Sequence, residues 1–304
     1  MTRAYQFFLC DVFAERPFAG NQLAVLPEAD GLSDGEMQQI AREFNFSESA
    51  FVLAPERGHT RRVRIFTPTC EVPFAGHPNI GTAFALAASG AFGPLDAPMT
   101  VTFEERAGLV PIAIERRDDG AIWCELRAPQ TLSIGKVLST RLVAAALGLA
   151  EDDIVTAAHE PQIVSVGLPF VIAELKNRDA LARARIHING FDALAAEGVV
   201  PDVHVYTRSA DEFDLRTRMF APFDGVPEDP ATGSANCALA GLLAHLDPVA
   251  DSRFHWRIAQ GVEMKRPSVL RASAEKVGGN VVETRIGGAS VLVASGTIDV
   301  GERA

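Results

Sequence analysis

Residues 64–83 read RIFTPTCEVPFAGHPNIGTA, and residues 218–235 read RMFAPFDGVPEDPATGSA. Both segments contain R-x-F-x-P, then V-P, and then a unit of the form (H/D)-P-x-x-G-(T/S)-A. His77–Pro78 matches Asp229–Pro230 at an offset of 152 residues, which is half of the 304-residue chain. Three ordered matches half a chain apart predict an internal duplication and two similar domains, and a period this long argues against a solenoid.

Each copy predicts a strand that runs into the N-terminus of a helix. His77 and Asp229 occupy the expected N-cap positions, and a proline follows each at N1, where its missing N–H costs nothing. The helical segments that follow are small or apolar on nearly every face, so each helix is expected to be buried all round inside its own domain. Gly90 is expected to end the first of these helices.

The N-terminus of a helix presents unpaired backbone N–H groups and a partial positive charge, which suits a carboxylate. Two duplicated domains that face each other would aim two such N-termini into one cleft. This arrangement would supply local anion binding in a chain whose net charge is -11. For either segment alone, capping of a buried helix explains the same residues.

The remainder of the chain predicts many strands and a few helices, which indicates an α+β fold. Ser33 and Glu36 form a capping-box pattern that opens one helix, and Ser139 is the expected N-cap of another. The chain is expected to divide into residues 1–130 and 131–290, with a strand near 291–304 that returns to the first domain. Strands are expected at 5–13, 23–26, 47–53, 62–66, 163–166, 170–175 and 204–206, with a hairpin over 112–124 and a glycine-punctuated pair at 281–286 and 290–293.

Composition narrows the possible partners. The net charge of -11 argues against nucleic acid and anionic membranes, because phosphate neutralisation dominates such binding. No apolar run approaches the roughly 20 residues that a membrane-spanning helix needs. The four cysteines are far apart, no histidine or carboxylate cluster has metal spacing, and no dinucleotide or phosphate loop is present. We therefore expect a cytoplasmic protein without a metal or another cofactor.

Five ordered segments resemble the PhzF family of phenazine-biosynthesis-like proteins, and the match spans nearly the whole chain. The family is similar in fold to diaminopimelate epimerase. The resemblance thus implies two domains related by a pseudo-twofold axis, each a curved, mostly antiparallel sheet or barrel around a central helix. It also implies a homodimer. The segments are FAGNQLAV (18–25), SESAFVL (47–53), RIFTPTCEVPFAGHP (64–78), EDPATGSAN (228–236) and QGVEMKRPS (260–268).

The resemblance implies a cofactor-free isomerase that moves a proton on a small carboxylated substrate of the dihydro-hydroxyanthranilate type. The family's proton-shuttling glutamate, in its S-E-(S/T) segment, matches Glu48. The histidine of GHP and the aspartate of DPATGSA match His77 and Asp229, which are expected to act with Glu48, and the serine of GSA matches Ser234, a substrate-binding residue. Further candidates for substrate binding are Gly76, Gly233, Thr232 and Asn21.

Glu48 has two interpretations from the residues around it. A carboxylate at the edge of a buried strand is expected to have a raised pKa, which suits a general acid–base at neutral pH. The simpler alternative is a carboxylate at the rim that bonds to neighbouring hydroxyls, such as that of Ser47.

Two other functions remain open beside the isomerase. The first is an epimerase or racemase of a small amino or hydroxy acid, and the second is a small-molecule-binding protein without chemistry. The epimerase relatives use two opposed cysteines, whereas the matching positions here are Ala75 and a residue within EDPATG. Racemisation by two thiols is therefore not expected.

Overall fold

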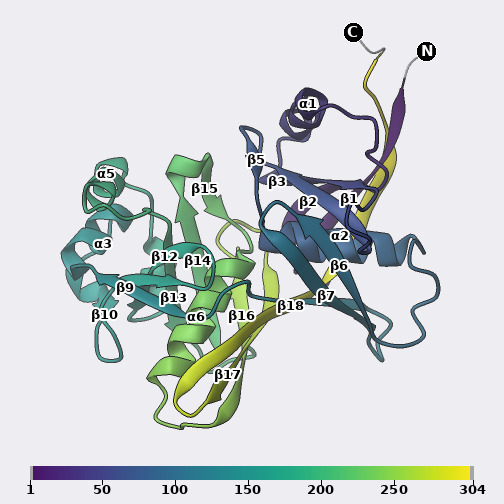
Figure 1. Ribbon diagram of the computed structural model, residues 1–304. Helices are drawn as coiled ribbons and strands as arrows, with labels where there is room; N and C mark the ends of the chain where they lie inside the picture. Colours follow the sequence, from purple (N-terminus) through teal and green to yellow (C-terminus); the bar gives the residue numbers. More distant parts are fainter. Residues whose placement is uncertain (1–2, 302–304) are drawn as a thin grey trace. The chain divides into compact units, whose positions relative to one another are not determined.

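The computed structural model describes residues 3–301 and divides the chain into two compact units (Figure 1). The first unit comprises residues 1–126 and 287–304, and the second comprises residues 127–286. Residues 302–304, the end of the strand expected near 291–304, lie outside the described part of the chain.

The first unit combines strands β1 to β8 and the end of β18 with two helices. Helix α1 has Ser33 as its N-cap, and the capping box with Glu36 that the sequence predicts is confirmed. Its buried face carries Met37, Ile40 and Ala41. The elements are β1 (Ala4–Val12), β2 (Asn21–Leu26), α1 (Asp34–Phe44), β3 (Glu48–Leu53), β4 (Arg61–Phe66), β5 (Glu71–Val72), α2 (Gly76–Ala88), β6 (Met99–Glu105), β7 (Gly108–Arg116) and β8 (Ile122–Arg127).

The second unit has more helices on its outside. Helix α3 begins after Ser139, whose side chain accepts a hydrogen bond from the Leu142 N–H, as predicted. The elements are β9 (Ser133–Val137), α3 (Thr140–Leu147), the 3-10 helix η1 (Glu151–Asp153), β10 (Ile154–Val155), β11 (Gln162–Ser165), β12 (Pro169–Leu175), α4 (Arg178–Arg183), α5 (Ile188–Ala196), β13 (Val203–Arg208), β14 (Leu215–Ala221), the 3-10 helix η2 (Pro222–Asp224), β15 (Val226–Asp229), α6 (Gly233–Leu246), β16 (Ser252–Gln260), β17 (Ser268–Val277) and β18 (Asn280–Asp299).

The two units repeat one strand topology. In the first unit, β2 is parallel to β3, β3 is antiparallel to β4, and β4 is antiparallel to β5 but parallel to β6, which pairs antiparallel with β7. Strands β12 to β17 of the second unit repeat this pattern. Here β12 is parallel to β13, β13 is antiparallel to β14, and β14 is antiparallel to β15 but parallel to β16, which pairs antiparallel with β17. The internal duplication and the mostly antiparallel α+β class are confirmed.

One helix in each unit is central. Every residue of α2 from Gly76 to Ala87 is buried, and it contacts β1, β2, β3 and β7. Nearly all of α6 is buried as well, and it contacts β11, β12, β16 and β17. The prediction of two helices buried all round is confirmed. Gly90, at φ +79°, ends α2 as predicted: the Ala91 N–H donates to the Leu86 carbonyl, and the Gly90 N–H donates to the Ala87 carbonyl.

The prediction of two short strands separated by glycines near the C-terminus is wrong. One continuous strand, β18, covers both predicted segments. Gly287 does not break the strand, because the absence of a side chain here lets the Trp123 ring lie close to the strand backbone. A Cβ on this residue would lie 2.8 Å from the Trp123 ring, and only glycine leaves room for the indole.

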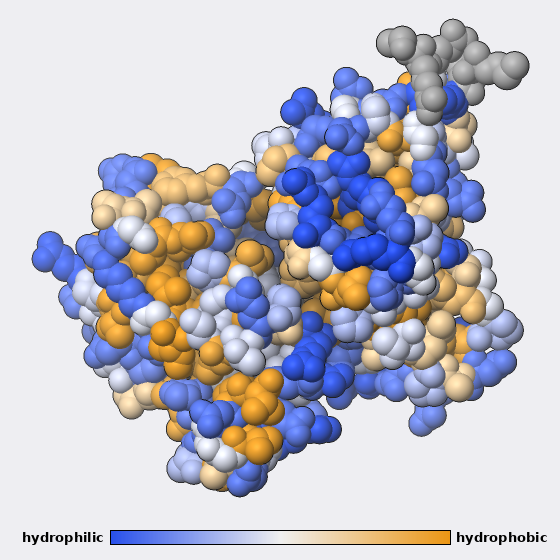
Figure 2. Space-filling model, viewed as in Figure 1, coloured by the Kyte–Doolittle hydropathy of each residue, from blue (hydrophilic) through white to orange (hydrophobic). Residues whose placement is uncertain are grey.

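Apolar side chains of the second unit reach the surface around strand β9. All five residues of β9 are exposed, including Ile134 and Val137. Figure 2 shows hydrophobic residues on the surface around β9 and α3. Among the described strand pairings, β9 pairs with β11 only, as an exposed edge strand.

Candidate active site

The first cluster of candidate residues lies where three elements of the first unit begin. Glu48 is the first residue of β3, Asn21 is the first residue of β2, and His77 is the second residue of α2. The parallel pairing of β2 with β3 brings the starts of these strands together at one end of the sheet. Asn21 and His77 are buried, and the Glu48 side chain is 19% exposed.

Hydrogen bonds order this cluster. The Ser47 hydroxyl donates to Asn21 Oδ1 at 3.2 Å, which leaves the Asn21 amide nitrogen facing His77 Nδ1 at 3.2 Å. Nδ1 then accepts a hydrogen bond, so the proton of a neutral His77 lies on Nε2. His77 Nε2 stands 3.5 Å from Glu48 Oε2. The histidine and the carboxyl group thus face each other across a gap slightly longer than a hydrogen bond.

The Glu48 carboxyl group titrates near neutrality. Burial raises its pKa to about 7, and the nearby Ser47 side chain opposes this rise. A raised pKa is what the sequence predicts for a carboxylate at the edge of a buried strand. A group with this pKa is available in both its protonated and its ionised form at neutral pH.

The second cluster surrounds the start of α6 in the second unit. Asp229 ends β15, Thr232 is the N-cap of α6, and Gly233 and Ser234 are the first two helical residues. The Thr232 hydroxyl donates to Asp229 Oδ2 at 2.5 Å. Asp229 and Thr232 are buried, whereas Ser234 is partly exposed.

Gln260, which the sequence analysis did not single out, connects these residues. Its Oε1 accepts from the Thr232 N–H at 3.1 Å and from Asn236 Nδ2 at 2.8 Å. Its Nε2 donates to the Asp229 carbonyl at 2.8 Å and to Thr232 Oγ1 at 2.9 Å. Gln260 is fully buried and uses both ends of its amide to fix the segment that leads into α6. It lies in the quoted segment QGVEMKRPS, but nothing in that segment indicates these partners.

The prediction that His77 and Asp229 are N-caps is wrong. The N-caps are Ala75 and Thr232. Asp229 remains extended because it pairs with Met219 as the last residue of β15, whereas β5 ends at Val72 and α2 begins sooner. By helix position, His77 therefore corresponds to Ser234.

This shift also changes which residues of the two repeats correspond. Gly76 matches Gly233, and Asn79 matches Asn236, so the correspondence moves by five residues from the one read in the sequence. The two asparagines bond alike. Asn79 Nδ2 donates to the Ala75 carbonyl at 3.0 Å, and Asn236 Nδ2 donates to the Thr232 carbonyl at 2.9 Å. The spacing G-x-x-N, which both segments share, is the feature of the sequence that indicates this correspondence.

The N-cap residues of the two central helices, Ala75 and Thr232, make no side-chain cap hydrogen bond. Helices α1, α3 and α4 are capped by Ser33, Ser139 and Asn177, whereas α5 has no side-chain cap. The first amides of α2 and α6 have no intrahelical partners either. These N–H groups and the helix dipole suit a bound carboxylate, as the sequence predicts.

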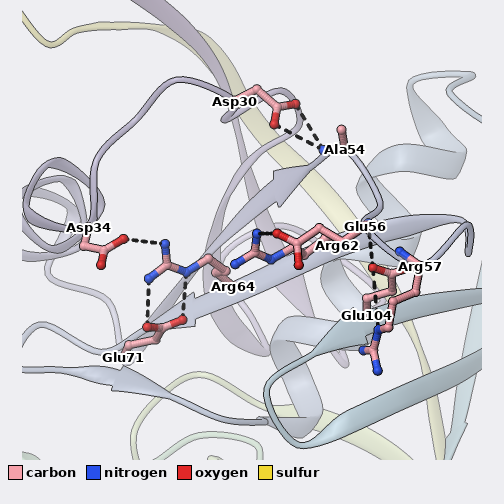
Figure 3. Close-up of polar contacts among 9 residues, drawn as sticks. All are labelled: Asp30, Asp34, Ala54, Glu56, Arg57, Arg62, Arg64, Glu71 and Glu104. Atoms are coloured by element: carbon pink, nitrogen blue, oxygen red, sulfur yellow. Dashed lines mark hydrogen bonds and ion pairs between the residues drawn. The ribbon is translucent and has the colours of Figure 1, made fainter.

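A partly buried ion pair supports the strand before each central helix. Arg64 binds Glu71 through two hydrogen bonds of 2.8 Å, and it also reaches Asp34 (Figure 3). Arg218 binds Glu228 through two hydrogen bonds of 2.7 and 2.9 Å. The two arginines are therefore structural residues within their own units, in agreement with the R-x-F-x-P repeat.

The model of the phenazine biosynthesis-like PhzC-PhzF family matches residues 10–296. The chain belongs to this family. It is 40% identical over 301 residues to an uncharacterised isomerase of Mesorhizobium japonicum, covering 96% of this chain and 98% of the relative. It is 37% identical over 294 residues to the trans-2,3-dihydro-3-hydroxyanthranilate isomerase of Pseudomonas aeruginosa, covering 96% and 98%. These relatives confirm that the PhzF-like chain is an isomerase.

Solved structures agree on the fold. A PhzF-family protein of Bacillus anthracis superimposes with a TM-score of 0.88 at 26% identity, covering 97% of this chain and 99% of that one. A hydroxyproline epimerase of Agrobacterium vitis, at a TM-score of 0.64 and 15% identity, shares the fold alone. The expected epimerase-like fold is confirmed.

Residues 3–301 are the part of the chain that the structure describes. No group of three or more histidine, cysteine, aspartate or glutamate side chains in this range could hold a metal ion. No helix in the same range is long and apolar enough to cross a membrane. None of the four cysteines forms a disulfide, and Cys70 is the one among them that is exposed.

Proposed function

We propose that the chain is a cofactor-independent isomerase in which Glu48 transfers a proton on a small carboxylated substrate. The observation that carries the proposal is the Glu48 carboxyl group, whose pKa is about 7, facing His77 Nε2 at 3.5 Å beside the uncapped start of α2. The substrate class follows from the relatives named trans-2,3-dihydro-3-hydroxyanthranilate isomerase.

The mechanism uses Glu48 first as a base and then as an acid. The ionised carboxylate removes a proton from a carbon next to a carboxylate or imine of the substrate. The protonated group then returns it to another carbon on the same face. A pKa near the working pH favours both steps. His77, held by Asn21, is assigned the role of steadying the charge on Glu48 and of hydrogen bonding to a substrate hydroxyl or amine.

The second unit is assigned to substrate binding. The N–H groups of the first turn of α6 and the Ser234 hydroxyl are suited to a carboxylate. Asp229 is assigned to a substrate amino group, and the hydrogen bond from Thr232 keeps its carboxyl group in place. The assignment of Asp229 and Ser234 to the same reaction as Glu48 rests on the family resemblance.

The partners follow from the same proposal. We expect a cytoplasmic homodimer that takes a small carboxylated substrate and binds no nucleic acid. The exposed edge strand β9 supports a contact with a second chain, and the net charge of -11 disfavours polyanions.

A racemase with two opposed thiols is not proposed. The N-cap positions of the central helices carry Ala75 and Thr232, and neither side chain can act as a general acid–base near neutral pH. An epimerase that uses Glu48 with another base differs from the isomerase in the stereochemistry of its product, which the experiment below records.

The test is proton NMR in deuterated buffer with the wild-type protein, Glu48→Gln and a panel of cyclic and acyclic amino and hydroxy acids. The panel includes trans-2,3-dihydro-3-hydroxyanthranilate. We expect deuterium at one carbon of a rearranged product with the wild type and no exchange with Glu48→Gln. Exchange that survives in Glu48→Gln would show that another group transfers the proton. Tight binding without exchange in the wild type would favour a binding protein.

A further inference from the structure

Glu105 is a buried ionisable residue that the proposed mechanism does not use. It is the last residue of β6 and is 7% exposed. Neither of its carboxyl oxygens has a hydrogen-bond partner of good geometry among the described residues, and the same holds for the Oδ1 of Asn79. The Asn79 amide nevertheless lies close enough to the Glu105 carboxyl group to lower its pKa against the larger effect of burial.

The second unit shows how the equivalent place is filled. Gln260 is the last residue of β16, as Glu105 is of β6, and the two strands lie parallel to β14 and β4 in the same register of the repeat. Gln260 accepts from Nδ2 of Asn236, the counterpart of Asn79. A neutral amide therefore stands in the second unit where a carboxyl group stands in the first.

The surroundings of the Oδ1 atoms of the two asparagines differ. In the second unit, His204 on β13 lies beside the Asn236 side chain, although neither its ring nitrogens nor Asn236 Oδ1 has a hydrogen-bond partner of good geometry among the described residues. Burial lowers the pKa of His204 to about 3, so the ring is neutral and keeps one N–H to donate. The register of β3 places Ala50 at the position of His204, and alanine has no donor. A donor for Asn79 Oδ1 must come from elsewhere, and Glu105 is the polar side chain beside it.

We propose that Glu105 is a positioning residue that works as a neutral carboxylic acid, joined to the Asn79 amide by a cyclic pair of hydrogen bonds. The Glu105 O–H donates to Asn79 Oδ1, and Asn79 Nδ2 donates to the Glu105 carbonyl oxygen. The second hydrogen of Nδ2 keeps its bond to the Ala75 carbonyl, at the N-cap of α2. The acid thus holds the first turn of α2, which carries His77.

The charges around Glu105 favour the neutral form. Burial raises its pKa to about 8, and no charged group contributes to that value. Its neighbours in sequence are engaged elsewhere. Glu104 accepts from the N–H groups of Glu56, Arg57 and His59, and Arg106 pairs with Glu71.

Loss of the proton above pH 8 removes the O–H donor and places a carboxylate against the Asn79 carbonyl oxygen. The first turn of α2 then loosens, and His77 loses its fixed place opposite Glu48. This part of the inference rests on the proposed function, whereas the protonation of Glu105 does not.

The experiment compares the wild type with Glu105→Gln, because glutamine offers the same acceptor and a permanent donor, as Gln260 does. The kcat of the wild type is expected to fall roughly tenfold per pH unit above about 8. Glu105→Gln should keep the neutral-pH kcat and lose this alkaline decline. The control is Glu115→Gln, a partly exposed carboxyl group on β7, which should behave as the wild type. An alkaline decline that persists in Glu105→Gln overturns the positioning role.

Infrared spectroscopy tests the protonation without any substrate. The wild-type minus Glu105→Gln spectrum should show the carbonyl stretch of a protonated carboxyl group at pH 7, and this band should disappear with a midpoint near pH 8. A carboxylate band at pH 7 overturns the proposal whether or not the protein is active. A band that titrates in a protein without turnover would support the Glu105–Asn79 pair and contradict the proposed isomerase function. If Glu105→Gln does not fold, a shift of the wild-type midpoint in Asn79→Ala serves instead.

Discussion

The starts of the two central helices share a backbone and differ in chemistry. Around α2 the polar groups are ionisable: Glu48, His77 and Glu105. Around α6 the buried network centres on a neutral side chain, with Gln260 bonded to Asn236 and the Thr232 N–H, beside the Asp229 carboxyl group that Thr232 holds. The two units share the strand topology and a central helix without a side-chain N-cap, and they differ in the side chains around the start of that helix. In the proposed function, the first unit transfers the proton and the second unit binds the ligand.

The largest loss of stability is expected from Gln260→Leu. The change leaves the Thr232 N–H and the Asp229 carbonyl buried without this partner and should lower the free energy of unfolding by about 3 kcal/mol. Chemical denaturation measures this value. The control Gln39→Leu, at an exposed position of α1, should change it by less than about 0.5 kcal/mol. Equal values for the two variants would show that the Gln260 hydrogen bonds do not stabilise the fold.

The two arginine–glutamate ion pairs are expected to differ in how much they contribute to the free energy of unfolding. Arg218 is 3% exposed and also donates to the carbonyls of Leu181 and Ala184. Its replacement by methionine should cost about 3 kcal/mol, because Glu228 is left without its partner. Arg64→Met should cost only about 1 kcal/mol, since Glu71 keeps Arg106 and Asp34 is exposed. Thermal unfolding of both variants gives the ranking, and a reversed order would contradict it.

The pH dependence of activity tests the chemistry of the first unit. Because Glu48 acts first as a base, kcat/KM should rise roughly tenfold per pH unit below about 7 and then level until Glu105 begins to ionise near pH 8. The same raised pKa makes the wild type lose stability relative to Glu48→Gln as the pH rises from about 4.5 to about 7. A kcat/KM that falls with pH across this range would assign Glu48 the role of an acid in the first step.

The smallest effect is expected from the binding residues of the second unit. Ser234→Ala removes one hydrogen bond to a substrate carboxylate, so KM should rise by roughly tenfold while kcat changes little. Steady-state kinetics separates the two constants. A fall in kcat at constant KM would place Ser234 in the chemical step instead.

The sequence predicted the parts of the fold that depend on local patterns. The capping box of Ser33 and Glu36, the hairpin around Gly120 and the two apolar helices are all fixed by residues near one another in the chain. The duplication was visible because the R-x-F-x-P repeat carries the buried arginine pairs.

The positions that depend on the sheet could not be read in this way. A proline after a polar residue looks like a helix start, yet Asp229 stays extended because it pairs with Met219. The two glycines at 287 and 288 look like a break, yet Gly287 is required by the nearby Trp123 ring. The partners of Gln260 and Glu105 are brought together by strand register, which no short segment of sequence records.

The measurement that tests the central claim most directly is calorimetric binding of substrate to Glu48→Gln, paired with its turnover. The account predicts that the Kd stays within about threefold of the wild-type value while kcat falls by at least about 10²-fold, because the carboxyl group supplies chemistry rather than affinity. Retained turnover, or loss of binding together with turnover, would contradict the division of work between the two units.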